Sequence, residues 1–268
     1  MVRYALTLAY EGSDYSGFAR QKDPAIITVQ EVLEQALATV LRLDIAPETV
    51  CAGRTDAGVH ALAQVVSFEL AGPALDARAC GRIVRSLNAI TPESMSVKLL
   101  QRTTEGFSAR FDAQSREYRY YIANTIYPPI FSKNFAWHIP TQLDLDVMKN
   151  ASQYLRGKHD FRSFCTSASA ADDKNTVREL SMVEVFEQSH FGENLICIRI
   201  VGNAFLHSMV RIIVGTLVEI AAAKRGVDEI PSILNARKRE AAGQTAPAHG
   251  LTLHKVEYLS SDILKQNN

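Results

Sequence analysis

A short loop in the first quarter of the chain combines residue types that acid–base or nucleophilic chemistry uses. Residues 53–58 begin and end with glycine, contain Arg54 and Asp56, and lie between two predicted strands. Glycine permits tight turns, so such a loop can present a carboxylate and a guanidinium at the end of a sheet. The same spacing also fits an ordinary Asx turn, in which Asp56 bonds nearby backbone amides. Spacing alone leaves both interpretations open.

Arg211 is the second candidate, because it lies in the most hydrophobic stretch of the chain, residues 204–223. No other Asp, Glu, Lys or Arg occurs between Arg199 and Glu219. In a helix over this stretch, the arginine shares its face with small side chains, namely Ala204, Ser208 and Gly215. An unpaired buried charge is very costly, so a buried Arg211 predicts a carboxylate partner. Alternatively, its stem crosses the surface and its head reaches water.

A strand predicted at 115–124 mixes aromatic and basic residues. Tyr118 and Tyr120 share one face of this strand, and Arg119 lies on the other. Aromatic rings interleaved with arginine suit stacking on unpaired bases and contact with phosphate. The structural alternative is that the tyrosines pack across strands while the arginines are solvated.

Basic residues are concentrated in the middle third of the chain. A helix predicted to begin at Asp76 carries arginines at spacings of four and seven residues, namely Arg78, Arg82 and Arg85, and Arg110 follows. Such a ridge can bind phosphates, or it is a solvated helix face. The whole chain has 29 Lys+Arg and 29 Asp+Glu. A polyanionic partner must therefore meet a local basic surface rather than a basic protein.

Several kinds of cofactor chemistry lack their usual motifs. The 268 residues contain no P-loop, no glycine-rich dinucleotide motif, no H-E-x-x-H and no G-x-S-x-G. The four cysteines form no C-x-x-C pair, which indicates neither a disulfide framework nor a zinc site. We expect a reaction that uses one carboxylate and neither a cofactor nor a metal.

The location of the protein is also predicted from sequence. The first residues lack the basic and apolar regions of a secretory signal. The apolar stretch 204–223 contains His207, Arg211 and Glu219, so it reads as a buried core helix rather than a membrane span. We therefore expect a cytoplasmic protein without a membrane partner.

Hydrophobic patterning predicts the order β-α-β-β-α-β in the first part of the chain. Thr28 and Glu31 have the spacing of a capping box and mark the start of the first helix. The predicted elements are strand 2–10, helix 29–41, strands 47–53 and 64–70, helix 76–88 and strand 94–103.

The second part repeats this order, with a short extra helix at 228–238. The predicted elements are strand 115–124, helix 144–156, strands 176–188 and 194–201, helix 204–223 and strand 251–259. Two successive βαββαβ units predict an α+β fold of two ferredoxin-like halves. We place the N-terminal domain, which carries the Asp56 loop, at residues 1–108. The C-terminal domain, which carries Tyr118 and Arg211, is placed at residues 109–268.

The loop of residues 53–60 closely resembles the signature of the tRNA pseudouridine synthase A family, and the likeness covers nearly the whole chain. Six further motifs match in order: Tyr10-Glu11-Gly12 with Gly17 and Gln21; Phe107-Ser108-Ala109-Arg110-Phe111; Tyr118-Arg119-Tyr120; His159-Asp160-Phe161 with Ser163-Phe164; Asn203-Ala204-Phe205-Leu206 with Met209-Val210-Arg211; and Thr245-Ala246-Pro247-Ala248 with Gly250-Leu251. The chain departs from the family at Phe18-Ala19, which is usually Trp-Gln, and at Gln244, which is commonly proline.

The resemblance implies two ferredoxin-like halves that share a central antiparallel sheet with an active-site cleft between them. It also implies a homodimer, tRNA as the substrate, and isomerisation of uridine to pseudouridine at positions 38, 39 and 40 of the anticodon stem-loop. By the same resemblance, Asp56 is the catalytic carboxylate, Arg211 pairs with it, and Tyr118 stacks on the target uracil. Arg54 is implied to contact the RNA vacated by the flipped nucleotide. We expect further RNA contacts from Arg78, Arg82, Arg85 and Arg110.

Two other functions compete with this one. A non-catalytic RNA-binding protein with RRM-like domains also combines ferredoxin-like folds with aromatic residues on its sheets. A glycosidase or nucleoside hydrolase usually needs a second carboxylate near the first, and the signature loop supplies one.

Overall fold

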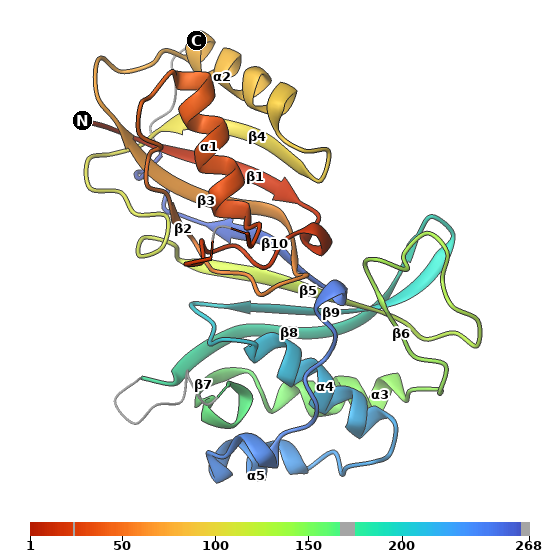
Figure 1. The fold of residues 1–268 in the computed structure, drawn as a ribbon. Helices are drawn as coiled ribbons and strands as arrows, with labels where there is room; N and C mark the ends of the chain where they lie inside the picture. Colours follow the sequence, from red (N-terminus) through yellow and green to blue (C-terminus); the bar gives the residue numbers. More distant parts are fainter. Residues whose placement is uncertain (24, 167–174, 264–268) are drawn as a thin grey trace. The chain divides into compact units, whose positions relative to one another are not determined.

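The computed structural model describes residues 1–23, 25–166 and 175–263, and the chain divides into two compact units. Unit 1 is Met1–Ser115 together with the C-terminal segment from Leu253, and unit 2 is Arg116–Thr252. Each unit combines helices with largely antiparallel strands, as Figure 1 shows. The predicted α+β class is confirmed.

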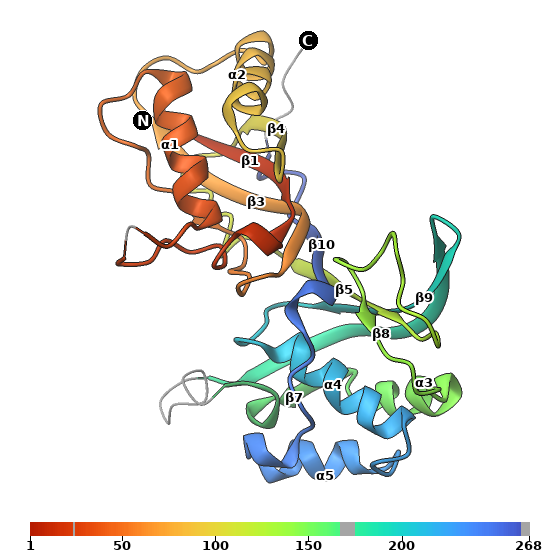
Figure 2. The ribbon, with the colours of Figure 1, turned by 45° about the vertical axis from the view of Figure 1, so that its right-hand side comes forward.

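Unit 1 has the predicted order of elements. They are β1 (Val2–Tyr10), α1 (Val29–Leu41), β2 (Val50–Cys51), β3 (His60–Leu70), α2 (Ala77–Ile90) and β4 (Met95–Arg102). β1 pairs antiparallel with β3 and β4, and β2 pairs antiparallel with β3. α1 and α2 lie side by side on one face of these strands (Figure 2).

Local sequence signals fix where both helices of unit 1 begin. The Thr28 hydroxyl accepts a hydrogen bond from the Glu31 N–H at 3.3 Å, and the Asp76 carboxylate accepts one from the Ala79 N–H at 2.7 Å. These side chains satisfy N–H groups that have no partner inside the helix. The inner face of α1 is apolar, and Leu33 is fully buried.

The division of the chain differs from the predicted ranges 1–108 and 109–268 at two places. Residues 109–115 belong to unit 1, because Ala109 is buried in an apolar cluster with Ala5, Val65 and Phe107. The C-terminal segment also returns to unit 1, where the Gln114 N–H donates to the carbonyl of Glu257 at 2.8 Å.

Unit 2 contains the remaining elements. They are β5 (Ser115–Ala123), β6 (Trp137–His138), α3 (Leu145–Gln153), β7 (Gly157–Asp160), β8 (Val177–His190), β9 (Glu193–Gly202), α4 (Met209–Ala221) and α5 (Glu229–Ala236). Its strands follow the order β5-β9-β8-β7, with antiparallel neighbours, and β6 pairs in parallel with β5. α3 and α4 contact each other and lie on one face of these strands (Figure 1). β10 (Leu251–Glu257) begins in unit 2 and continues into unit 1.

The prediction of a helix over 204–223 was wrong at its start. α4 begins at Met209, because Ser208 has a left-handed backbone with φ of 59°. Ala204 therefore lies outside the helix and does not share a helical face with Arg211. Within the described residues, no helix is long and apolar enough to cross a membrane.

Candidate active site

The loop that carries Asp56 is held by the segment that follows β1. The N–H of Phe18 donates to the carbonyl of Thr55 at 3.0 Å, and the N–H of Gly58 donates to the carbonyl of Tyr15 at 3.4 Å. Tyr15 and Phe18 are both buried. The backbone on either side of Asp56 is thus fixed by a segment some forty residues earlier, while Asp56 itself is half-buried.

Two glycines allow this close approach. A Cβ added at Gly12 would lie 2.1 Å from the carbonyl oxygen of Val59, a distance that no side chain permits. Gly17 has φ of +96°, and a Cβ there would lie 3.0 Å from the carbonyl oxygen of Thr55. Both glycines belong to the first motif of the sequence, and the structure explains them as packing partners of the Asp56 loop.

A buried polar network also holds the Asp56 loop in place. The hydroxyls of Tyr10 and Thr55 are 2.8 Å apart, and the side-chain amide of Gln64 donates to the carbonyl of Gly53 at 2.7 Å. Tyr10, Thr55 and Gln64 are all almost completely buried. A satisfied buried network of this kind restricts the conformations of the loop. The sequence pattern placed Tyr10 in a matched motif without a role and did not single out Gln64, because neither side chain carries a charge.

Positive charge gathers beside this loop within unit 1. Burial raises the pKa of the Cys51 thiol to about 11, while the positive charges of Arg54 and Arg110 act to lower it. Both arginines are exposed. The guanidinium carbon of Arg110 lies 5.4 Å from the ring centroid of Phe111, which is itself 78% exposed. Phe111 belongs to a motif matched in the sequence but was given no role there, although an exposed aromatic beside arginine suits contact with nucleic-acid bases.

Tyr118 lies on β5 in unit 2. Its side chain is 6% exposed, and its ring meets that of Phe205 edge to face, with centroids 5.0 Å apart. Phe205 is in the non-helical segment that precedes α4. The predicted strand position is observed, whereas a role in stacking on a base stays a prediction.

Arg119 of this strand is paired with an acidic neighbour. Arg119 pairs with Glu117 at 2.8 Å, and Arg199 of β9 pairs with the same carboxylate at 3.0 Å. Burial alone would raise the pKa of Glu117, but these two guanidinium groups outweigh it and lower the pKa. Arg119 is therefore held in an ion pair within unit 2.

Arg211 lies in the first turn of α4 and is half-buried. Its Nε donates to the carbonyl of Ala246 at 2.8 Å, and the N–H of Ala246 donates back to the carbonyl of Arg211 at 3.1 Å. Burial raises the pKa of the nearby Tyr120, and the charge of Arg211 opposes that effect. The hydroxyl of Tyr120 donates to the carbonyl of Pro247 at 2.8 Å. The predicted pairing of Arg211 with Asp56 stays a prediction.

The predicted basic ridge lies on α2. All three arginines, Arg78, Arg82 and Arg85, are exposed, and none of them forms an ion pair in the part of the chain that the structure describes. Their charge is thus available to solvent or to an anionic partner. The four cysteines are buried and unbridged. The described residues contain no group of three or more His, Cys, Asp or Glu side chains placed to hold a metal ion.

Comparison with known proteins places this chain in a family. A family model described as tRNA pseudouridine synthase matches residues 7–112 and 151–259. Among curated relatives, a tRNA pseudouridine synthase A of Brevibacillus brevis is 42% identical, over 96% of this chain and 100% of the relative. Those of Bacillus licheniformis and Bacillus subtilis are 40% and 39% identical, each over 96% of this chain and 99% of the relative. A crystal structure of the archaeal box H/ACA sRNP Nop10–Cbf5 complex aligns with a TM-score of 0.33 and 10% identity, over 80% of this chain and 44% of that one. That structural likeness is too low to support an argument.

Proposed function

The chain belongs to the tRNA pseudouridine synthase family, and we propose that it isomerises uridine to pseudouridine at positions 38, 39 and 40 of the anticodon stem-loop. The enzyme is an isomerase that acts on tRNA. We propose Asp56 as its catalytic carboxylate. The observation that carries this assignment is the Asp56 loop, whose backbone is held from two sides while its arginine neighbours stay exposed.

A single carboxylate can serve this reaction. The base must leave ribose through its nitrogen and return through carbon, so the glycosidic bond has to be broken and remade. Asp56 can attack ribose as a nucleophile or remove a ribose proton as a base. Either role needs an ionised carboxylate at a fixed position, which a firmly held loop favours.

Side chains of both units would serve orientation and binding. The target uridine lies in a helical stem and must be extruded before it reacts. In this proposal Tyr118 stacks on the extruded uracil, Arg211 pairs with Asp56, and Arg54 contacts the RNA that the nucleotide vacates. Arg110 and the α2 ridge would bind phosphates, which supply most of the affinity for RNA.

The test is incubation of the protein with tRNA transcripts that carry uridine at position 38, 39 or 40, followed by nucleoside analysis. We expect pseudouridine without release of uracil. Binding without any product would favour the RRM-like RNA-binding protein, and free uracil would favour a hydrolase. Transcripts with cytidine at all three positions serve as the control and should yield no pseudouridine.

We further propose that the enzyme acts in the cytoplasm as a homodimer, as the family resemblance implies. Sedimentation at enzyme concentrations used for the activity assay would measure the mass directly. A species of 29.6 kDa, the mass of one chain, would contradict the dimer.

A further inference from the structure

The chain that follows α5 passes alongside α4 before it reaches β10 (Figures 1 and 2). We call residues 243–247 of this segment the strap. Ala246 of the strap makes the two hydrogen bonds with Arg211 described above. Because a guanidinium group is planar, a bond that fixes Nε also fixes the plane in which the two terminal nitrogens lie. The strap therefore sets the orientation of the Arg211 side chain.

The strap is bound to α4 at consecutive turns of the helix. The hydroxyl of Thr216 accepts a hydrogen bond from the N–H of Gly243 at 2.9 Å, and the Glu219 carboxylate accepts one from the N–H of Gln244 at 2.8 Å. Gly215 lets the strap pass close to the helix, since an added Cβ would lie 1.8 Å from the carbonyl oxygen of Gln244.

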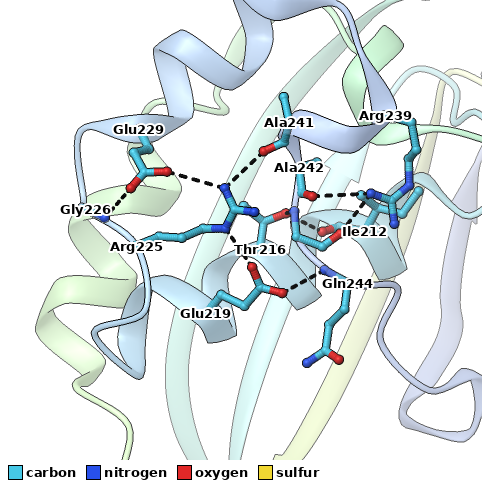
Figure 3. A network of polar contacts seen from close by, with 11 residues as sticks. Ile212, Thr216, Glu219, Arg225, Gly226, Glu229, Arg239, Ala241, Ala242 and Gln244 are labelled. Carbon is cyan, nitrogen blue, oxygen red and sulfur yellow. Dashed lines mark hydrogen bonds and ion pairs between the residues drawn. The ribbon is translucent and has the colours of Figure 1, made fainter.

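Two further arginines brace this arrangement, as Figure 3 shows. Arg225 donates to the Glu219 carboxylate at 2.6 Å and to the carbonyl of Ala241 at 3.0 Å. Arg239 donates to the carbonyl of Gly243 at 2.9 Å. Hydrogen bonds with a charged partner are stronger than neutral ones, so the strap is held more firmly than backbone contacts alone would hold it.

The charge on Glu219 is maintained at neutral pH. Burial alone would raise its pKa, but the N–H of Gln244 and the guanidinium group of Arg225 outweigh burial and lower the pKa. Thr216 is fully buried, and its hydroxyl also donates to the carbonyl of Ile212 at 2.8 Å. Thr216 and Glu219 thus each bond the strap and a second partner, which fixes their side chains in place.

We propose that the strap is a positioning device for Arg211, and that Thr216 and Glu219 are positioning residues for the isomerisation. The inference rests on the proposed function, because only a catalytic part for Arg211 makes its orientation matter for turnover. Thr216 and Glu219 bond the strap and the helix rather than RNA. Their loss should therefore lower kcat while the KM for tRNA stays unchanged.

The test compares Thr216→Val and Thr216→Ser in the natural chain and in an Arg211→Lys chain. Valine keeps the shape of threonine without the hydroxyl, and we expect kcat to fall about tenfold at unchanged KM, since small misplacements can cost this much. Serine restores the hydroxyl and should restore kcat. Thr39→Val is the matched control, because the Thr39 hydroxyl also donates to a carbonyl four residues earlier, at 3.0 Å, but Thr39 is exposed and lies on α1 of unit 1, whereas the strap belongs to unit 2.

The Arg211→Lys background tells whether the effect passes through Arg211. Arg211→Lys alone should lower kcat, and Thr216→Val added to it should change kcat less than about twofold, because the planar group that the strap orients is gone. Equal fold losses in both backgrounds would overturn the positioning role while leaving the proposed function intact. A full kcat for Arg211→Lys would overturn the positioning role together with the part proposed for Arg211, whereas the isomerase activity itself would stand. Glu219→Gln, measured in the same two backgrounds, gives the answer if Thr216→Val does not fold.

Discussion

At the scale of single residues, the group proposed to react is distinct from the groups that hold it. Asp56 is half-buried, whereas the residues of the polar network that holds its loop, Tyr10, Thr55 and Gln64, are almost completely buried. Replacement of Asp56 by asparagine removes the charge with little change in shape. We expect Asp56→Asn to fold and to bind tRNA, but to lose pseudouridine formation by roughly a thousandfold or more. Nucleoside analysis measures the loss, and melting temperature and tRNA affinity are the controls. Near-normal turnover would contradict the assignment.

Tyr118 combines packing with its proposed contact to uracil. Its edge-to-face contact with Phe205 contributes about 0.5–1.5 kcal/mol in pairs of this kind. We expect Tyr118→Leu to lose more in kcat than in affinity for tRNA. One stacked base contributes about 1–3 kcal/mol, whereas phosphate contacts supply most of the affinity. Tyr118→Phe keeps the ring and should keep most of the activity. Steady-state kinetics with both variants would measure the difference, and equal activity of the leucine and phenylalanine variants would exclude a stacking role.

At the scale of elements, α2 offers the clearest test of an RNA surface. Replacement of Arg78, Arg82 and Arg85 together by glutamine should weaken tRNA binding and flatten its dependence on salt. Each lost phosphate contact lowers the slope of log K against log salt by about 0.7–0.9. The matched control replaces three exposed lysines of unit 2, namely Lys133, Lys158 and Lys224. If the slope changes equally in both variants, the effect comes from net charge alone, and the α2 arginines do not contact phosphates.

Elements with strong local signals could be predicted from sequence, and short ones could not. The cap of α1 at Thr28 and the alternating pattern of β1 predicted both elements at their observed bounds. β6 and β7 escaped prediction, because strands of two and four residues show no periodicity, and the two-residue β2 was predicted only as part of a longer strand over 47–53. The true start of α4 at Met209 depends on the left-handed backbone of Ser208, which hydrophobicity does not report.

At the scale of the whole molecule, acid should destabilise the chain through unit 2. The Ser132 hydroxyl and three backbone N–H groups, opposed by burial, lower the pKa of Glu193 to about 2. The pKa values of Glu117 and Glu219 are also lowered from 4.5. A carboxyl whose pKa is lower in the folded state stabilises the fold above its unfolded pKa and loses that contribution as pH falls.

We therefore expect the free energy of unfolding to be constant above about pH 5 with respect to these groups and to fall between about pH 4.5 and pH 2. Urea denaturation at a series of pH values measures this dependence. Glu117→Gln should make the curve shallower, because one of the three titrating groups is gone. A curve of unchanged steepness would show that the ion pairs of Glu117 with Arg119 and Arg199 add nothing to stability.

The sequence by itself determined the helix caps, most strands, the Asp56 loop and the family, because each of these depends on residues that are neighbours along the chain. It also singled out Arg211 as a charge that needs a partner. Only the tertiary structure decided what surrounds these residues. Tyr10 forms a hydrogen bond with Thr55, 45 positions away in sequence, and Arg211 forms one with Ala246, 35 positions away. Such contacts depend on the register of strands and on where a returning segment packs, and no local pattern of side chains encodes either.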